Sequence, residues 1–218
     1  MTERSILFSA PMIHALLEGR KSQTRRLAWR ERKCEGGPIN DGGGQMDYVE
    51  PSIVRSPSPW QAVKPGDRVW VRENWCPRAE DGRVIPGAAH YMADGEHVVK
   101  TDGDGFTVKL GDGREASPWR PSIHMPRWAS RMTLVLTDVR VQRLQDISEA
   151  DAEAEGLWRS RARRHLWWLS PNAVRIFEPY RSHLEAFSAL WNSLHGPGSW
   201  EKNPEVVALS FTVERKAP

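Results

Sequence analysis

The segment 132–143 restricts the fold more than any other part of the sequence. Its apolar residues alternate at positions 132, 134 and 136 and then shift phase to positions 139 and 141. Alternation is typical of a strand with one buried face, and a phase shift is typical of a β-bulge, which bends the strand. The run 206–213 also alternates and predicts the last strand of the same sheet. We therefore expect a sheet that curls at the bulge.

Shorter strands and helices are expected around this sheet. Pro11 suits the first turn of a helix, and Gly19 suits its end. Ser148 and Asp151 form the capping-box pattern at the start of another helix. Gly66, which follows a proline, predicts a type II turn before a strand. The expected elements are strands at 5–8, 69–73, 89–93 and 106–110, and helices at 11–18, 149–155 and 179–194.

The composition is typical of a soluble chain. The mean hydropathy is -0.60, and no apolar run approaches the length of a membrane span. The start of the chain does not resemble a signal peptide, so we expect a cytoplasmic protein with no membrane partner. Cys34 and Cys76 are too few for a disulfide framework and show no metal-ligand spacing with the histidines. We expect neither a metal nor another cofactor.

The 218 residues fit one domain, 1–218, with insertions at about 30–60, 77–118 and 158–179. The first insertion is rich in Gly, Pro and Ser and is expected to have little independent structure. One interpretation makes it a mobile flap over a site. The sequence leaves the oligomeric state open.

Positive charge is distributed unevenly along the chain. The net charge of +3 is too small to indicate a nucleic-acid-binding protein by itself. Lys and Arg nevertheless cluster at 20–33, 114–131 and 159–164, each time with tryptophan nearby. This mixture suits phosphate contact combined with base stacking. The alternative is that most of the 11 tryptophans fill the core.

The segment 19–26 places Lys21, Thr24 and Arg26 in the pattern Gly-x-Lys-x-x-Thr-x-Arg. We expect it to be a loop just past the first helix. Two interpretations stay open: a solvated basic surface, or a turn that faces an anion. Glu155 is expected in the last turn of its helix, where the helix dipole disfavours a carboxylate. A neighbouring lysine would supply the missing stabilisation.

Four further segments accompany this pattern in a fixed order. They are 64–71, 135–144, 147–156 and 206–213. Together with 19–26 they resemble the ASCH domain, a member of the PUA-like superfamily. The resemblance implies an α+β fold, a PUA-like mixed β-barrel with flanking helices and long loop insertions.

The resemblance extends to bacterial ASCH enzymes that hydrolyse the amide of N(4)-acetylcytidine. It implies that Lys21, Thr24 and Glu155 are catalytic: the lysine activates a nucleophile or holds an oxyanion, the threonine attacks or orients water, and the glutamate moves a proton. The chain departs from those enzymes in its insertions and in Arg25, which stands where they have a more apolar residue. Lys21 must then lie near Glu155.

Other ASCH proteins are better described as nucleic-acid or nucleotide binders, and some resemble RNA-cleaving proteins. The pattern in this chain is similar to that of ASCH-like proteins from bacteriophages and prophages. The expected partner is RNA, a single-stranded nucleic acid or a modified nucleoside. The alternatives are a non-catalytic binding module, a ribonuclease-like activity, or a phage assembly or host-interaction protein. The candidate binding residues are Arg25, Arg26, Arg72, Glu73, Trp119, Arg120, His124, Arg127 and Trp128. An ion pair on a sheet rim is the alternative for Arg72 and Glu73, and a buried structural histidine is the alternative for His124.

Overall fold

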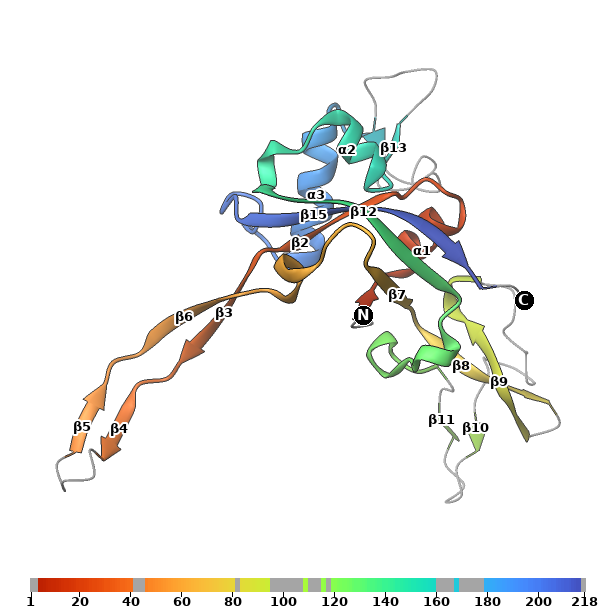
Figure 1. Ribbon diagram of the computed structural model, residues 1–218, viewed down its shortest axis with the longest axis horizontal. Helices are drawn as coiled ribbons and strands as arrows, with labels where there is room; N and C mark the ends of the chain where they lie inside the picture. Colours follow the sequence, from red (N-terminus) through yellow and green to blue (C-terminus); the bar gives the residue numbers. More distant parts are fainter. Residues whose placement is uncertain are drawn as a thin grey trace.

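The computed structural model describes residues 4–40, 46–80, 83–94, 108–109, 115–116, 119–159, 167–168 and 179–216. It has an α+β fold around a curled five-stranded sheet with the strand order β1-β7-β12-β15-β2 (Figure 1). These strands are β1 (Arg4–Leu7), β7 (Arg68–Arg72), β12 (Met132–Arg143), β15 (Glu205–Arg215) and β2 (Gln23–Leu27). Only β1 and β7 run parallel. Within the described residues no backbone ladder joins the edge strands β1 and β2, so the sheet is a half-barrel.

Strand β12 has the bounds and the bulge that its sequence predicts. Its register against β15 shifts between Leu136 and Asp138. The turn before β7 is also confirmed, because Gly66 has a φ of +91° and Asp67 N donates to Lys64 O at 3.0 Å. The same turn continues the sheet, since Leu136 N donates to Asp67 O at 2.9 Å. The bulge that bends β12 therefore lies where the turn before β7 packs against this strand.

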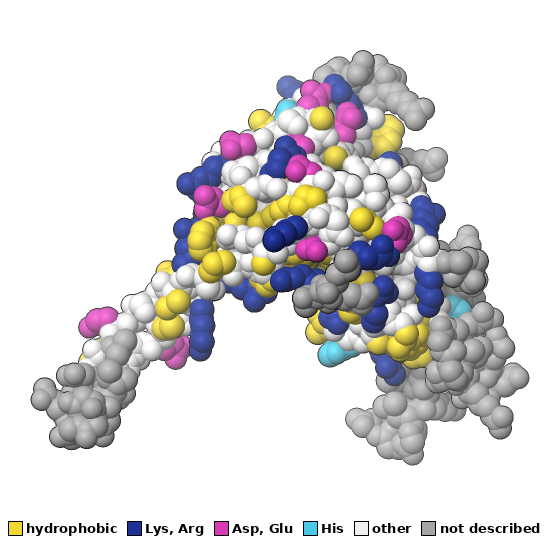
Figure 2. All heavy atoms as spheres, viewed as in Figure 1, with side chains coloured by type: hydrophobic (Ala, Val, Ile, Leu, Met, Phe, Trp, Pro, Cys, Tyr) yellow, Lys and Arg dark blue, Asp and Glu magenta, His cyan; other side chains and the backbone are white. Residues whose placement is uncertain are grey.

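Residues 29–40 and 46–57 form a two-stranded arm that leaves the body of the molecule (Figures 1 and 2). Strand β3 (Trp29–Cys34) pairs with β6 (Ser52–Pro57), and β4 (Gly37–Asn40) pairs with β5 (Met46–Val49). The expectation of little independent structure is wrong here. Every residue of β6 is exposed, so neither face needs apolar residues and the sequence lacks the alternation by which a strand is recognised.

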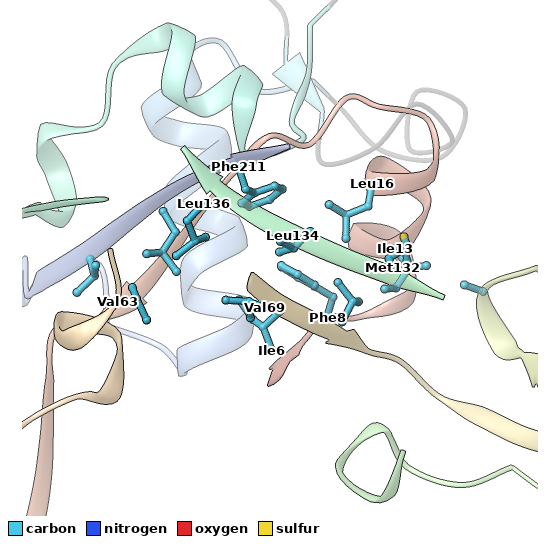
Figure 3. Packing of buried hydrophobic residues seen from close by; sticks show 14 of the residues in the cluster. Ile6, Phe8, Ile13, Leu16, Val63, Val69, Met132, Leu134, Leu136 and Phe211 are labelled. Carbon is cyan, nitrogen blue, oxygen red and sulfur yellow. The ribbon is translucent and has the colours of Figure 1, made fainter. Parts of the chain in front are cut away.

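The main core fills the concave face of the sheet (Figure 3). Leu134, Leu136 and Leu209 from the sheet pack with Ile13 and Leu16 of helix α1 (Ala10–Leu17), and all five are at most 2% exposed. Each such side chain contributes about 1.5–3 kcal/mol through burial. Helix α1 is thereby fixed against the concave face.

Two helices cover the opposite face of the sheet. They are α2 (Glu149–Ala154) and α3 (His183–His195). Phe187 and Trp191 of α3 pack with Val206, whereas Val207 next to it belongs to the concave core, as the alternation of a strand requires. Helix α3 begins later than its apolar spacing predicts, because Ser182 caps it by accepting from Glu185 N.

The remaining elements are short or lie outside the sheet. Within the described residues the strands are β8 (Trp75–Glu80), β9 (Arg83–Tyr91), β10 (Val108–Lys109), β11 (Glu115–Ala116), β13 (Trp158–Arg159) and β14 (Trp167–Trp168). The 3-10 helices described there are η1 (Pro59–Ala62), η2 (Met92–Asp94), η3 (Ser122–His124), η4 (Arg127–Ala129) and η5 (Leu144–Asp146). The ends of the expected strand 106–110 and most of the insertion 158–179 lie outside the described residues. Among the described helices, none has the length and apolar character needed to cross a membrane.

Candidate functional site

Lys21 and Glu155 meet inside the protein, so their expected convergence is confirmed. Lys21 Nζ donates to Glu155 Oε2 at 2.8 Å and to the carbonyl oxygen of Glu155 at 2.7 Å. The lysine side chain is 0% exposed and the glutamate side chain 4%. The interpretation of the basic segment as a solvated surface is therefore wrong for Lys21. An ion pair of this kind is removed from the screening that water gives to surface pairs.

The backbone brings these two residues together at a close approach of two turns. Ser22 N donates to the carbonyl of Ala154 at 2.8 Å, which ties the loop after α1 to the end of α2. Gly156 follows with a φ of +97°, and a Cβ there would lie 3.1 Å from Ala15 Cβ and 3.4 Å from Lys21 Cβ. Glycine is therefore required here for two reasons: it adopts the left-handed backbone conformation readily, and there is no room for a Cβ.

Thr24, Arg25 and Arg26 lie on strand β2, not in the loop that the sequence predicts. A strand is recognised by apolar residues on its buried face, but here a buried position is occupied by Arg25, which is 4% exposed. The strand pattern is therefore hidden in the sequence. In the ladder with β15, Thr24 is opposite Leu209 and Arg25 is opposite Ala208. Since paired residues share a face, Arg25 faces α2 and α3 while Thr24 and Arg26 face the concave side.

Arg25 extends the ion pair into a network. Its Nη1 lies 3.2 Å from Glu155 Oε1, and its Nη2 donates to Asp151 Oδ2 at 3.0 Å. Gln23 supports both partners, since its Oε1 accepts from Arg25 and its Nε2 donates to Asp151 Oδ1 at 3.0 Å. Arg140 also reaches Asp151, with its Nη2 3.2 Å from Oδ1, so three cations surround the two carboxylates of this network.

Burial changes the acid–base properties of these groups. Removal from water lowers the pKa of Lys21 more than the negative charge of Glu155 and its hydrogen bond raise it. Partial burial acts to raise the pKa of Asp151, but the hydrogen bond from Gln23 and the charge of Arg25 bring that pKa below its usual value. Lys21 consequently gives up its proton more readily than a surface lysine does.

A cavity of about 200 Å³ opens beside the network, between α1, β2 and α3. Its polar wall includes Thr24, Arg25, Arg26 and Glu155. The apolar wall is formed by Leu7, Met12, Phe187, Leu190, Trp191 and Leu194, and His195 and Ser9 complete the lining. Pockets for drug-sized ligands are typically about 300–1,000 Å³, so this one suits a smaller group such as a single base.

Arg26 bridges the open side of the half-barrel. Its Nη2 donates to the carbonyl oxygen of Leu7 at the end of β1, at 2.7 Å. The guanidinium lies over the rings of Phe8 and Trp60, at 5.2 and 6.0 Å from their centroids. Burial lowers its pKa from the ordinary value. Arg26 thereby joins edge strands β1 and β2 where the backbone does not.

Arg72 and Glu73 belong to a separate cluster. Glu73 pairs with Arg131 at 2.8 Å, whereas Arg72 stacks on Trp70 at 4.6 Å, so the two do not form the rim ion pair with each other that was one alternative. Glu73 lines a second cavity of about 240 Å³, which shares Leu7 and Ser9 with the first.

The segment 119–131 also contributes to this second cluster and does not line the cavity beside Glu155. Its contacts are made to β7 and β8: Arg120 pairs through its backbone with Trp75, Arg127 lies over Trp70 at 5.8 Å, and Trp128 meets Trp75 edge-on at 5.5 Å. Trp119 is partly buried. His124 is exposed, so the interpretation as a buried structural histidine is wrong.

Sequence reasoning missed several residues of the site. Asp151 was identified only as a capping residue, and it is one, but it also holds Arg25. Phe187 and Trp191 were expected on a packing helix, and no local signal places them beside a cavity. Within the described residues, no group of three or more His, Cys, Asp or Glu side chains is arranged to hold a metal.

Comparisons of the chain with protein-family models, with curated proteins and with solved structures found no match.

Proposed function

We propose that the chain is a PUA-like ASCH protein that hydrolyses the amide of an acylated base, of the N(4)-acetylcytidine type, in the cavity beside Glu155. The observation that carries this proposal is the buried pair of Lys21 and Glu155 next to a cavity that Thr24 also lines. These three residues lie in the segments that resemble the ASCH enzymes. Fold resemblance alone would not identify an activity.

The proposed reaction is transfer of the acyl group to water. A C–O bond forms at the acyl carbon, the amide C–N bond breaks, and the products are a carboxylate and the free amine of the base. The Thr24 hydroxyl orients the attacking water, or it attacks the acyl carbon itself, and in that case water then cleaves the acyl-threonine ester and restores the hydroxyl. Glu155, which lines the cavity, takes the proton from that nucleophile and returns it to the leaving nitrogen, and Lys21 holds this carboxylate in place through its hydrogen bond.

Each wall of the cavity has a role in this proposal. Arg25 and Arg26 supply positive charge where the oxyanion forms. Phe187 and Trp191 offer aromatic surface for the flat base. Glu155 keeps Lys21 in place through two acceptor oxygens.

The direct test is hydrolysis of N(4)-acetylcytidine by the purified protein, measured by chromatography of the released cytidine. Thr24→Val and Lys21→Met should abolish turnover, and circular dichroism should show that the variants are folded. Lys64→Met is the matched control, because Lys64 is exposed on the turn before β7. A fully active Lys21→Met protein would reject the proposed site.

A binding module without catalysis is the second candidate. It is favoured by the pairing of Lys21, whose Nζ already donates to two acceptor oxygens of Glu155. Such a module would bind N(4)-acetylcytidine in calorimetry and release no cytidine. Binding combined with turnover excludes it.

A further inference from the structure

A wide groove lies where the arm joins the body. It has a volume of about 840 Å³ and runs between β3, β6, η1, the end of α3 and the segment 199–205. We call it the arm groove and define it by Arg30, Arg55, Arg143, Lys202, Trp29 and Trp60. Arg26, Trp191 and His195 line both the arm groove and the cavity beside Glu155, so the groove adjoins that cavity.

Positive charge exceeds negative charge in the arm groove. Five cationic side chains line it, from Arg26 and the four named in its definition, against the two carboxylates Glu31 and Glu205. Glu205 accepts from Trp29 Nε1 at 2.7 Å, and Glu31 lies 4.0 Å from Arg55 with both side chains more than half exposed. The remaining charge suits a chain of phosphates. Figure 2 shows Lys and Arg side chains gathered where the arm meets the body.

Aromatic rings alternate with these cations. Arg55 lies over the ring of Trp29 at 5.0 Å, and Arg26 lies over Trp60 at 6.0 Å. Deeper in, Trp191 stacks on His195 with their centroids 4.0 Å apart. Arginine planes and aromatic faces both stack with unpaired bases, and their combination with a basic groove is typical of single-strand binding.

We propose that the arm groove binds a single-stranded polynucleotide and leads one of its bases into the cavity beside Glu155. This inference rests on the proposed function for the identity of that base, and it makes the substrate a nucleotide within a strand. The strand must be single because a paired base cannot enter a cavity of about 200 Å³ without leaving its stack. The arm then acts as one wall of the strand's path.

The test is the binding of a fluorescently labelled, unmodified oligonucleotide of about 12 nucleotides, within the size range of single-strand sites, measured by anisotropy at several salt concentrations. Ribo- and deoxyribo-oligonucleotides are compared, and tighter binding of the first would identify contacts to the 2′-hydroxyl. The variant Arg30→Ala/Arg55→Ala should weaken binding on the order of tenfold at low salt and reduce the slope of log K against log salt by about 1.4, for two lost phosphate contacts.

The matched control is Arg32→Ala/Lys33→Ala, which removes the same charge from the same arm at residues that do not line the groove. Equal losses in the two variants would overturn the proposal, as would duplex or polyglutamate binding as tight as that of the single strand. The assay needs no turnover. Binding without hydrolysis of N(4)-acetylcytidine therefore refutes only the proposed function, and hydrolysis without strand binding refutes only the arm groove.

Discussion

Lys21 Nζ lies 2.8 Å from Glu155 Oε2, although 134 positions separate the two residues in the chain. Neither side chain has more than 4% of its surface exposed. The pair connects the loop after α1 to the end of α2, and Arg25 places a second cation against the same carboxylate. The stability of the fold and the chemistry of the cavity therefore depend on the same atoms.

Replacing Glu155 should destabilise the protein strongly. Glu155→Gln leaves Lys21 and Arg25 buried near each other without their shared negative charge, and breaking a buried pair in this way costs about 3–5 kcal/mol. Lys21→Met should cost less, because Glu155 still pairs with Arg25. Urea unfolding measures both values, with Glu201→Gln as the control at an exposed position. Equal stability of Glu155→Gln and the wild type would contradict the importance of the network.

Gly156→Ala should be more harmful than the same change at another glycine with positive φ. Both Gly156 and Gly198 have positive φ, and backbone strain of this kind costs about 1–3 kcal/mol. A Cβ added at Gly156 would lie 3.1 Å from Ala15 Cβ, whereas a Cβ added at Gly198 would have no neighbouring atom within 4 Å. The difference in unfolding free energy between the two variants isolates the close contact. A larger loss of stability from Gly198→Ala than from Gly156→Ala would show that the close contact between the loop after α1 and the end of α2 does not require a glycine.

Asp151 should contribute stability that disappears in acid. Its pKa is lower in the folded protein than its ordinary value of 3.8, so its contribution is complete above that value and is lost as the pH falls through the lowered folded pKa. Unfolding measured from pH 7 down to about pH 2 should show a steeper loss for the wild type than for Asp151→Asn. Other carboxylates, such as Glu214, titrate in both proteins and cancel in the comparison. Parallel curves would mean that Asp151 gains nothing from Arg25 and Gln23.

Shortening the arm should leave the body intact. Cys34 is opposite Ser52, and joining these positions through an Asn-Gly turn removes the outer part of the arm and keeps Arg30 and Arg55. Tyr48 in the removed part is 64% exposed, and Glu35, Glu50 and Pro51 are exposed as well, so we expect the unfolding free energy to change by no more than about 0.5 kcal/mol, as for other surface changes. Thermal unfolding checks stability, and anisotropy checks that strand binding remains. A large loss of stability would show that the outer arm supports the core.

Local patterns in the sequence predicted a large part of this fold. The alternation and phase shift in 132–143 predicted β12 with its bulge, and the proline-glycine turn predicted the start of β7. The arm was not predicted, because its strands are exposed on both faces. Strand β2 was mistaken for a loop, because Arg25 and Arg26 are buried by partners from distant segments.

The sequence by itself determined β12 with its bulge, the turn before β7 and the capped helix α2, and it showed which residues have the chemistry of a site. The meeting of Lys21 with Glu155 was expected from a resemblance, but the role of Arg25 in binding the same glutamate was not. Only the tertiary structure decided that the cluster around Glu73 stands apart from this cavity and that α3 supplies the aromatic wall. The physical reason is that local pattern follows from backbone and side-chain periodicity, whereas a buried charge is stabilised only by partners that folding brings from elsewhere in the chain.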